Sequence, residues 1–278
     1  MILKKIYTKV FNKIRLFLLK QTYNFKRIED EQNNLYKKIG YDREAAIKVL
    51  DTLYTNHPNT KVLVSEHHLL FAAESLLNNT NSILEIGTYT GSCTKLLSVL
   101  FPESMITTYD LPDDDSIFAE TYEREDKAKR SLFINQRNAL LASCNNVDFV
   151  QKNSLELQFN SKNIKFDLIW VDGAHGYPVV AMDIMNSLIC LSSNGSMFID
   201  DVWTKRSSND PNYRSIGAYE SILALKHSNL INFELIPKRI EFPHGEGFMK
   251  KYIARITHSE YSKNNFLKWI NLENITSP

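Results

Sequence analysis

The sequence predicts an α/β fold: a mainly parallel sheet with helices on both faces, an antiparallel C-terminal strand pair, and an N-terminal helical extension. Two observations predict it. From about residue 82, short apolar runs rich in β-branched residues alternate with longer helical stretches, which is typical of parallel strands joined by crossover helices. The last two runs alternate apolar and polar residues, which is typical of half-buried antiparallel strands.

The expected elements follow this pattern along the chain. Parallel strands are predicted at residues 82–87, 105–110, 147–152, 166–172 and 196–201, and the antiparallel strands at 231–237 and 251–256. Helices are predicted at residues 41–54, 65–77, 91–100, 120–143, 178–191 and 217–227. We expect residues 1–78 to form the helical extension, 79–257 the catalytic domain and 258–278 a C-terminal tail.

Composition limits the class of protein. The 278 residues, 43% of them hydrophobic, suffice for one α/β domain with a modest extension. A formal net charge of +1 lacks the basic excess typical of nucleic-acid binders, so we expect a small-molecule partner and no nucleic acid. The three cysteines form no CxxC pair, as expected for free thiols in the cytoplasm. No run approaches the roughly 18 apolar residues of a membrane span.

The first 27 residues form a basic block without any acidic residue. Apolar residues recur there at helical spacing, which predicts an amphipathic helix. Charges interrupt the apolar run, so a secretory signal is not expected. The helix is expected to pack on its own domain or on a second subunit, which would make the chain a homo-oligomer. Alternatively, it makes a peripheral contact with a membrane surface.

A glycine-bearing turn follows the first predicted strand, in the segment LEIGTYTGSCTKLL at residues 84–97. Gly87 and Gly91 lie where the chain must turn out of the sheet, and a Cβ there would obstruct close approach to a ligand. Thr88 and Tyr89 stand where the dinucleotide fingerprint G-x-G-x-x-G has its second glycine, which argues against NAD. Glu85 supplies a carboxylate suited to a cationic ligand.

Asp110 ends the second predicted strand, 23 positions after Gly87. This is close to the spacing of about 20 at which an acidic residue accepts hydrogen bonds from a ribose diol in such folds. The alternative is a loop aspartate that begins the acidic cluster 113–115.

Three aspartates follow two further strands. Asp172 ends one strand, and Asp200 and Asp201 end the next, so the carboxylates are expected together at the carboxyl edge of the sheet. Like charges so close are costly unless a cation joins them. Oxygen ligands suit Mg²⁺, Ca²⁺ or Mn²⁺. The sequence therefore predicts a divalent-metal site, with Mg²⁺ as the first choice.

His175, three residues after Asp172, is the predicted general base. It would take the proton of a substrate hydroxyl whose pKa the metal has lowered. The alternative is a histidine that caps or braces the loop.

Four segments together resemble class I S-adenosylmethionine-dependent methyltransferases. The E-x-G-x-x-x-G turn resembles their first motif. The segment VDGAHGYPVVAMDI resembles the D-G-x-H-x-Y segment of bacterial methyltransferase-24-like enzymes, several of which act on sugars and natural products. The segment YDLPDDD resembles that of uncharacterised members. The spacing of Asp172, Asp200 and Asp201 is similar to that of catechol-type metal-dependent O-methyltransferases, although Asp201 replaces a commoner Asn. Asp201 would then bind the metal more tightly or lie outside its coordination shell.

The resemblance implies a Rossmann-like fold, S-adenosylmethionine as cofactor, and a cofactor site. Its residues would be Glu85, Gly87, Tyr89, Gly91, Asp110, Asn153, Ser154 and Asp172, with Asn153 and Ser154 at the adenine edge. The expected reaction is methyl transfer to a hydroxyl of a small molecule or sugar, with a divalent metal. Two alternatives stay open: a metal-independent N- or O-methyltransferase, and a non-catalytic scaffold with the same fold.

Overall fold

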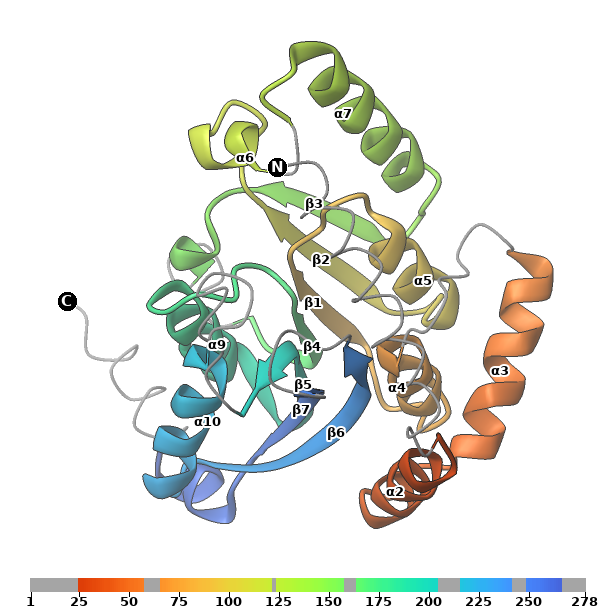
Figure 1. The fold of residues 1–278 in the computed structure, drawn as a ribbon, viewed down its shortest axis with the longest axis vertical. Helices are drawn as coiled ribbons and strands as arrows, with labels where there is room; N and C mark the ends of the chain where they lie inside the picture. Colours follow the sequence, from red (N-terminus) through yellow and green to blue (C-terminus); the bar gives the residue numbers. More distant parts are fainter. Residues whose placement is uncertain are drawn as a thin grey trace, which may run out of the picture.

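A seven-stranded sheet forms the centre of the protein (Figure 1). The structure is a computed structural model and describes residues 25–57, 66–121, 124–157, 164–204, 216–241 and 249–266. The strands are β1 (Ser82–Ile86), β2 (Met105–Asp110), β3 (Val147–Gln151), β4 (Phe166–Val171), β5 (Leu191–Trp203), β6 (Ile231–Glu241) and β7 (Met249–His258). Their order is β3-β2-β1-β4-β5-β7-β6. β3, β2, β1, β4 and β5 pair in parallel, while β7 pairs antiparallel with β5 and with β6, which confirms the predicted sheet.

Helices cover both faces of this sheet, as predicted. They are α2 (Phe25–Lys38), α3 (Arg43–Asn56), α4 (Glu66–Ser75), α5 (Ser92–Leu100), α6 (Ser116–Glu120), α7 (Lys127–Ala142), α9 (Val179–Cys190) and α10 (Gly217–His227). Ile184 of α9 and Ile222 of α10 are buried in one core cluster with Ile199 of β5. Phe71 of α4 and Leu97 of α5 belong to a second core cluster. In Figure 1 these two helix groups flank the sheet on opposite sides.

The described part of the N-terminal extension packs on the C-terminal strands. Gln32 Nε2 in α2 donates to the Pro237 carbonyl of β6 at 2.8 Å. Arg255 Nε of β7 donates to Tyr41 Oη at 3.1 Å, and Tyr41 Oη also donates to Glu74 of α4. The helices before β1 therefore share the core of the sheet.

The predicted helix 120–143 corresponds to α7, which begins later, and the short α6 ends at residue 120, where the prediction began. An aspartate caps each of these two helices. Asp115 accepts from the backbone amides of residues 117 and 118 and begins α6. Asp126 accepts from the amides of residues 128 and 129 and begins α7. Such N-caps satisfy amides that lack a partner within the first turn of a helix.

Both antiparallel strands extend beyond their predicted bounds, and in β6 a bulge interrupts the alternation that defined the prediction. The pairing of β5 with β7 also shifts between Ile199 and Val202, where Asp200 and Asp201 lie opposite a single residue of β7. The pairing of β6 with β7 shifts between Pro237 and Arg239, at Lys238. A bulge adds a residue to one strand and re-aims the side chains beside it.

The structure describes only part of the two terminal segments for which predictions were made. Residues 1–24 of the predicted basic helix lie outside the described residues. The predicted tail begins in β7, and His258 Nδ1 there is 2.9 Å from Ser262 Oγ in the short η3 helix (Ser262–Phe266); residues 267–278 lie outside the description.

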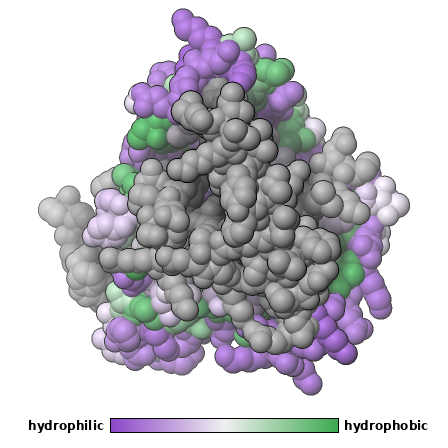
Figure 2. Space-filling model, viewed as in Figure 1, coloured by the Kyte–Doolittle hydropathy of each residue, from purple (hydrophilic) through white to green (hydrophobic). Residues whose placement is uncertain are grey.

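On the face that Figure 2 shows, hydrophilic residues gather at the top and bottom, with small hydrophobic patches beside them. Among the described helices, none has the length and apolar character needed to cross a membrane. Cys93, Cys144 and Cys190 are free thiols, as expected, but only Cys190 is fully buried.

Candidate active site

Three neighbouring strands end at one edge of the sheet. Ile86 of β1 pairs with Val171 of β4, which pairs with Ile199 of β5. The residues that follow these three positions therefore meet at the carboxyl edge. The chain crosses from β3 at one side of the sheet to β4 beside β1, so this edge is also where the strand order reverses, which is where α/β folds bind ligands.

The glycine turn after β1 lies close to other parts of the chain. Gly87 has φ +101°, and a Cβ there would lie 2.4 Å from the Asp172 carbonyl oxygen. Gly91 has φ +78°, and its Cβ would lie 3.1 Å from Leu141 Cδ2. The sequence predicted that these glycines allow close approach to a ligand. In the structure the close approaches within the protein are to the residue after β4 and to α7, and the positive φ of both residues favours glycine. The close approach of a ligand to Gly87 and Gly91 stays a prediction.

Glu85 lies beneath this turn and is fully buried. Its Oε2 accepts hydrogen bonds from Thr108 Oγ1 at 2.6 Å and from Thr94 Oγ1 at 2.5 Å. Burial raises the pKa of Glu85 to about 7, against the opposing effect of these hydroxyls. The carboxyl group thus ties β1 to β2 and α5, and direct contact with a cofactor stays a prediction.

Asp110 and Tyr89 lie together beside the turn. The Tyr89 amide donates to Asp110 Oδ2 at 2.8 Å, and the Leu111 amide donates to Asp110 Oδ1 at 2.8 Å. Burial raises the pKa of Asp110, while the two amides oppose the shift. Each carboxylate oxygen has a second lone pair, so Asp110 can still accept from two hydroxyls. Tyr89 has φ +47° and its side chain is 47% exposed.

The residues after β3 have local structural roles. Asn153 Oδ1 accepts from the Leu155 amide at 3.0 Å and caps the short η2 helix (Ser154–Glu156). Ser154 is half-buried, and its carbonyl accepts from Asn186 of α9 at 3.4 Å. A contact of Asn153 and Ser154 with an adenine ring stays a prediction.

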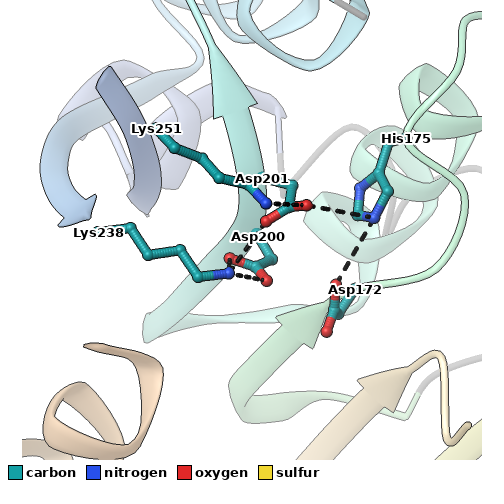
Figure 3. Close-up of polar contacts among 6 residues, drawn as sticks. All are labelled: Asp172, His175, Asp200, Asp201, Lys238 and Lys251. Atoms are coloured by element: carbon teal, nitrogen blue, oxygen red, sulfur yellow. Dashed lines mark hydrogen bonds and ion pairs between the residues drawn. The ribbon is translucent and has the colours of Figure 1, made fainter. Parts of the chain in front are cut away.

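His175 lies between two carboxylates, as Figure 3 shows. Its Nε2 is 3.8 Å from Asp172 Oδ1 and 3.9 Å from Asp201 Oδ2. Burial lowers the pKa of His175, although Asp201 and Asp200 oppose the shift. Burial and the Asp200 carboxylate raise the pKa of Asp172. The sequence thus predicted correctly that these side chains lie together.

Two lysines, which the sequence analysis did not select, lie on the other side of this cluster (Figure 3). Lys238 Nζ is 2.6 Å from Asp200 Oδ1, 2.5 Å from Asp200 Oδ2 and 3.0 Å from Asp201 Oδ1. Lys251 Nζ forms an ion pair with Asp201 Oδ2. Burial alone would lower the pKa of Lys238, but Asp200 and Asp201 outweigh it and raise the pKa.

The lysines change the expected electrostatics of Asp200 and Asp201. Burial would raise the pKa of Asp201, but Lys238 and Lys251 lower it below its ordinary value. Burial raises the pKa of Asp200, with Lys238 opposing. Among the described residues, no group of three or more His, Cys, Asp or Glu side chains has an arrangement that could hold a metal ion. Two ammonium groups thus contact Asp200 and Asp201, two of the three carboxylates that the sequence predicted as metal ligands.

Sequence reasoning missed the lysines because they lie far along the chain, in strands predicted only as half-buried. One signal was present: Lys238 and Lys251 lie within or beside apolar alternation, where a charged side chain needs a partner. The three carboxylates needed a cation, and these lysines were available candidates.

The comparisons with known proteins agree with this fold. Leu84–Val202 matches the model of a family described as "Methyltransferase domain". Among solved structures, the SAH-bound methyltransferase PaMTH1 of Podospora anserina is 15% identical, with a TM-score of 0.50; the match covers 86% of this chain and 97% of PaMTH1. The SAM-bound O-methyltransferase TomG of Streptomyces achromogenes is 17% identical, with a TM-score of 0.48 and coverage of 84% and 99%. A search of curated proteins found no match.

The likeness to PaMTH1, at 15% identity, shows a shared fold. The fold predicted from the sequence, a Rossmann-like sheet, is confirmed. Residues 84–202 resemble a methyltransferase domain, and the matched stretch includes the glycine turn, Asp110, the D-G-x-H segment and both aspartates of β5.

Proposed function

We propose that the protein transfers the methyl group of S-adenosylmethionine to a hydroxyl oxygen of a small molecule or sugar, with His175 as the general base. The observation that supports this most directly is the position of His175 between Asp172 and Asp201, at the sheet edge beside the glycine turn. A half-buried histidine with a lowered pKa is neutral near pH 7, which is the form that accepts a proton.

The chain's own residues fit S-adenosylmethionine. Asp110 has lone pairs left for the two ribose hydroxyls, since each of its oxygens accepts one backbone amide. Asp172 is 34% exposed by side chain and lies next to the turn. Its carboxyl group could accept a hydrogen bond or, when ionised, pair with a cation. The cofactor, when bound, supplies a methyl group activated by a positively charged sulfur.

In this proposal the protein contributes alignment and proton removal. Asp110 and the turn would hold the cofactor, the residues around Asp172 would orient the acceptor, and His175 Nε2 would take the hydroxyl proton. The methyl–oxygen bond would form as the methyl–sulfur bond breaks, with S-adenosylhomocysteine as the leaving group. Holding two reactants in line converts an encounter in solution into a step within one complex, which accounts for a large part of such rate enhancements. No step is assigned to a metal, because ammonium groups contact the carboxylates that would bind it.

The experiment is a methyl-transfer assay with labelled S-adenosylmethionine and panels of hydroxyl- and amine-bearing acceptors. The proposal expects label on a hydroxyl acceptor, and transfer slower by about 10²-fold or more in a His175→Ala protein under the same conditions. Label found only on amines would contradict the choice of oxygen. A protein that binds the cofactor but labels no acceptor of either kind would favour the scaffold alternative.

A further inference from the structure

The carboxylate cluster at the end of β5 contains its own cations. Asp200 is 5% exposed, Lys238 7% and Lys251 6%. Both oxygens of Asp200 contact Lys238 Nζ, and the two oxygens of Asp201 contact Lys238 and Lys251, one each. Every carboxylate oxygen of these two aspartates therefore has an ammonium partner inside the protein.

We propose that Lys238 and Lys251 hold the place of a divalent metal in this site, and that the enzyme works without one. A Mg²⁺ ion bound to Asp200 would lie about 2.1 Å from a carboxylate oxygen. That oxygen lies 2.6 Å or less from Lys238 Nζ. The metal and the ammonium would then be less than about 5 Å apart, and two cations so close repel strongly where water is excluded.

Backbone geometry indicates that this arrangement is a built feature of the fold. In a regular strand, Asp200 and Asp201 would point to opposite faces of the sheet. The bulge in β5 and the φ of +56° at Asp201 bring both carboxylates to one ammonium. Lys238 is itself the extra residue of the bulge in β6, and it reaches past β7 to β5. Two bulges in different strands thus converge on one ion-pair cluster.

The lysines act as positioning residues. Lys238 Nζ contacts three carboxylate oxygens, which matches the three hydrogens of an ammonium, so it fixes Asp200 and Asp201. Asp201 then lies 3.9 Å from His175 on the side facing the cluster. The acceptor hydroxyl would reach His175 and Asp172 without a Lewis acid. Only this last step, and the assay below that measures methyl transfer, rest on the function proposed above.

Metal binding is tested directly, without an acceptor, by the Mn²⁺ electron paramagnetic resonance signal in the presence of the full chain. We expect wild type and Asp200→Asn to leave the same amount of Mn²⁺ free. The Lys238→Ala/Lys251→Ala protein should gain a Mn²⁺ site, and adding Asp200→Asn should remove it. Lys226→Ala, at an exposed position of α10, is the matched control and should behave as wild type.

Wild type that binds one Mn²⁺, with loss of that binding in Asp200→Asn, would overturn the proposal, and this comparison holds even if the double variant fails to fold. A folded double variant without a Mn²⁺ site would overturn it too. In the methyl-transfer assay, activity should stay within about twofold in excess chelator. Activity that vanishes with chelator and returns with Mg²⁺ would contradict metal independence, whereas no activity in any condition would count against the proposed function alone.

Discussion

At the scale of single residues, His175 combines burial with two nearby carboxylates. Burial favours the neutral ring, while Asp201 and Asp200 favour the charged ring, and the pKa of His175 is lowered on balance. Because the neutral form is the base, proton uptake by His175 in acid should remove activity only below the ordinary histidine pKa of about 6.5.

Replacing His175 with Ala should lower kcat by about 10²- to 10⁴-fold, the usual contribution of a general base, and should leave cofactor affinity nearly unchanged. The measurement is the single-turnover rate at saturating cofactor from pH 5 to 9. Wild type should lose rate below pH 6.5, and the variant should lack this limb. His227→Ala, at an exposed position of α10, is the control. A wild-type kcat in His175→Ala would rule out its role as base.

The sequence predicted correctly which side chains lie together where the fold itself brings them close. Asp172, His175, Asp200 and Asp201 were placed together because adjacent parallel strands end at one edge. The same reasoning could not find Lys238, because its position depends on bulges that no local pattern reveals. The sequence therefore indicated that a cation was needed and could not tell an ammonium from a metal.

At the scale of elements, the turn after β1 is tightly packed against the end of β4. A Cβ at Gly87 would lie 2.4 Å from the Asp172 carbonyl oxygen and 2.7 Å from its carbonyl carbon. Neither atom can move without displacing β4, because the Asp172 amide donates to the Ile86 carbonyl at 2.8 Å.

Gly87→Ala should therefore destabilise the cofactor-free protein by about 2–4 kcal/mol, from its positive φ and the clash with the Asp172 backbone. Gly176→Ala is the matched control, since a Cβ there has no atom within 4 Å, and it should change stability by less than about 0.5 kcal/mol. Urea denaturation of both variants gives the comparison. Equal midpoints for wild type and Gly87→Ala would refute the packing explanation.

Element bounds were predicted well where one pattern dominates. Helix α10 has the predicted bounds, and β2 does as well. The start of α7 was predicted too early, and α6 was missed, because the N-caps Asp115 and Asp126 that begin these helices were not recognised. The end of β6 was missed because Lys238 breaks the alternation by which a half-buried strand is recognised.

At the scale of the whole molecule, parts distant in sequence support the site. Helix α2 bonds to β6 at Pro237, next to Lys238, and α4 is linked through Tyr41 to Arg255 of β7. The strands that supply both lysines therefore rest on the helices before β1. The expected contact of residues 1–27 with a second subunit or a membrane stays a prediction.

Global stability should depend on pH through Glu66, a buried residue 3.4 Å from Tyr36 Oη. Burial raises the pKa of Glu66 from 4.5 to about 7. The folded state then holds a proton that the unfolded state releases, so this contribution to stability is complete below pH 4.5 and is lost as pH rises to about 7.

Glu66→Gln removes this titration. Between pH 4.5 and 8, wild type should lose about 3 kcal/mol of unfolding free energy relative to Glu66→Gln. Urea denaturation at both pH values measures it, with Glu120→Gln, exposed at the end of α6, as control. A difference that does not vary with pH would contradict the raised pKa.

Binding of S-adenosylhomocysteine, measured by calorimetry, tests most directly whether the carboxyl edge of the sheet is a methyltransferase site. Wild type should bind one equivalent in roughly the micromolar range, as expected for a site with several polar anchors. Asp110→Ala should bind severalfold more weakly or worse, because the ribose loses its carboxylate. Asp114→Ala, exposed in the same loop, should bind as wild type. No binding to wild type, or unchanged affinity in Asp110→Ala, would contradict the site described.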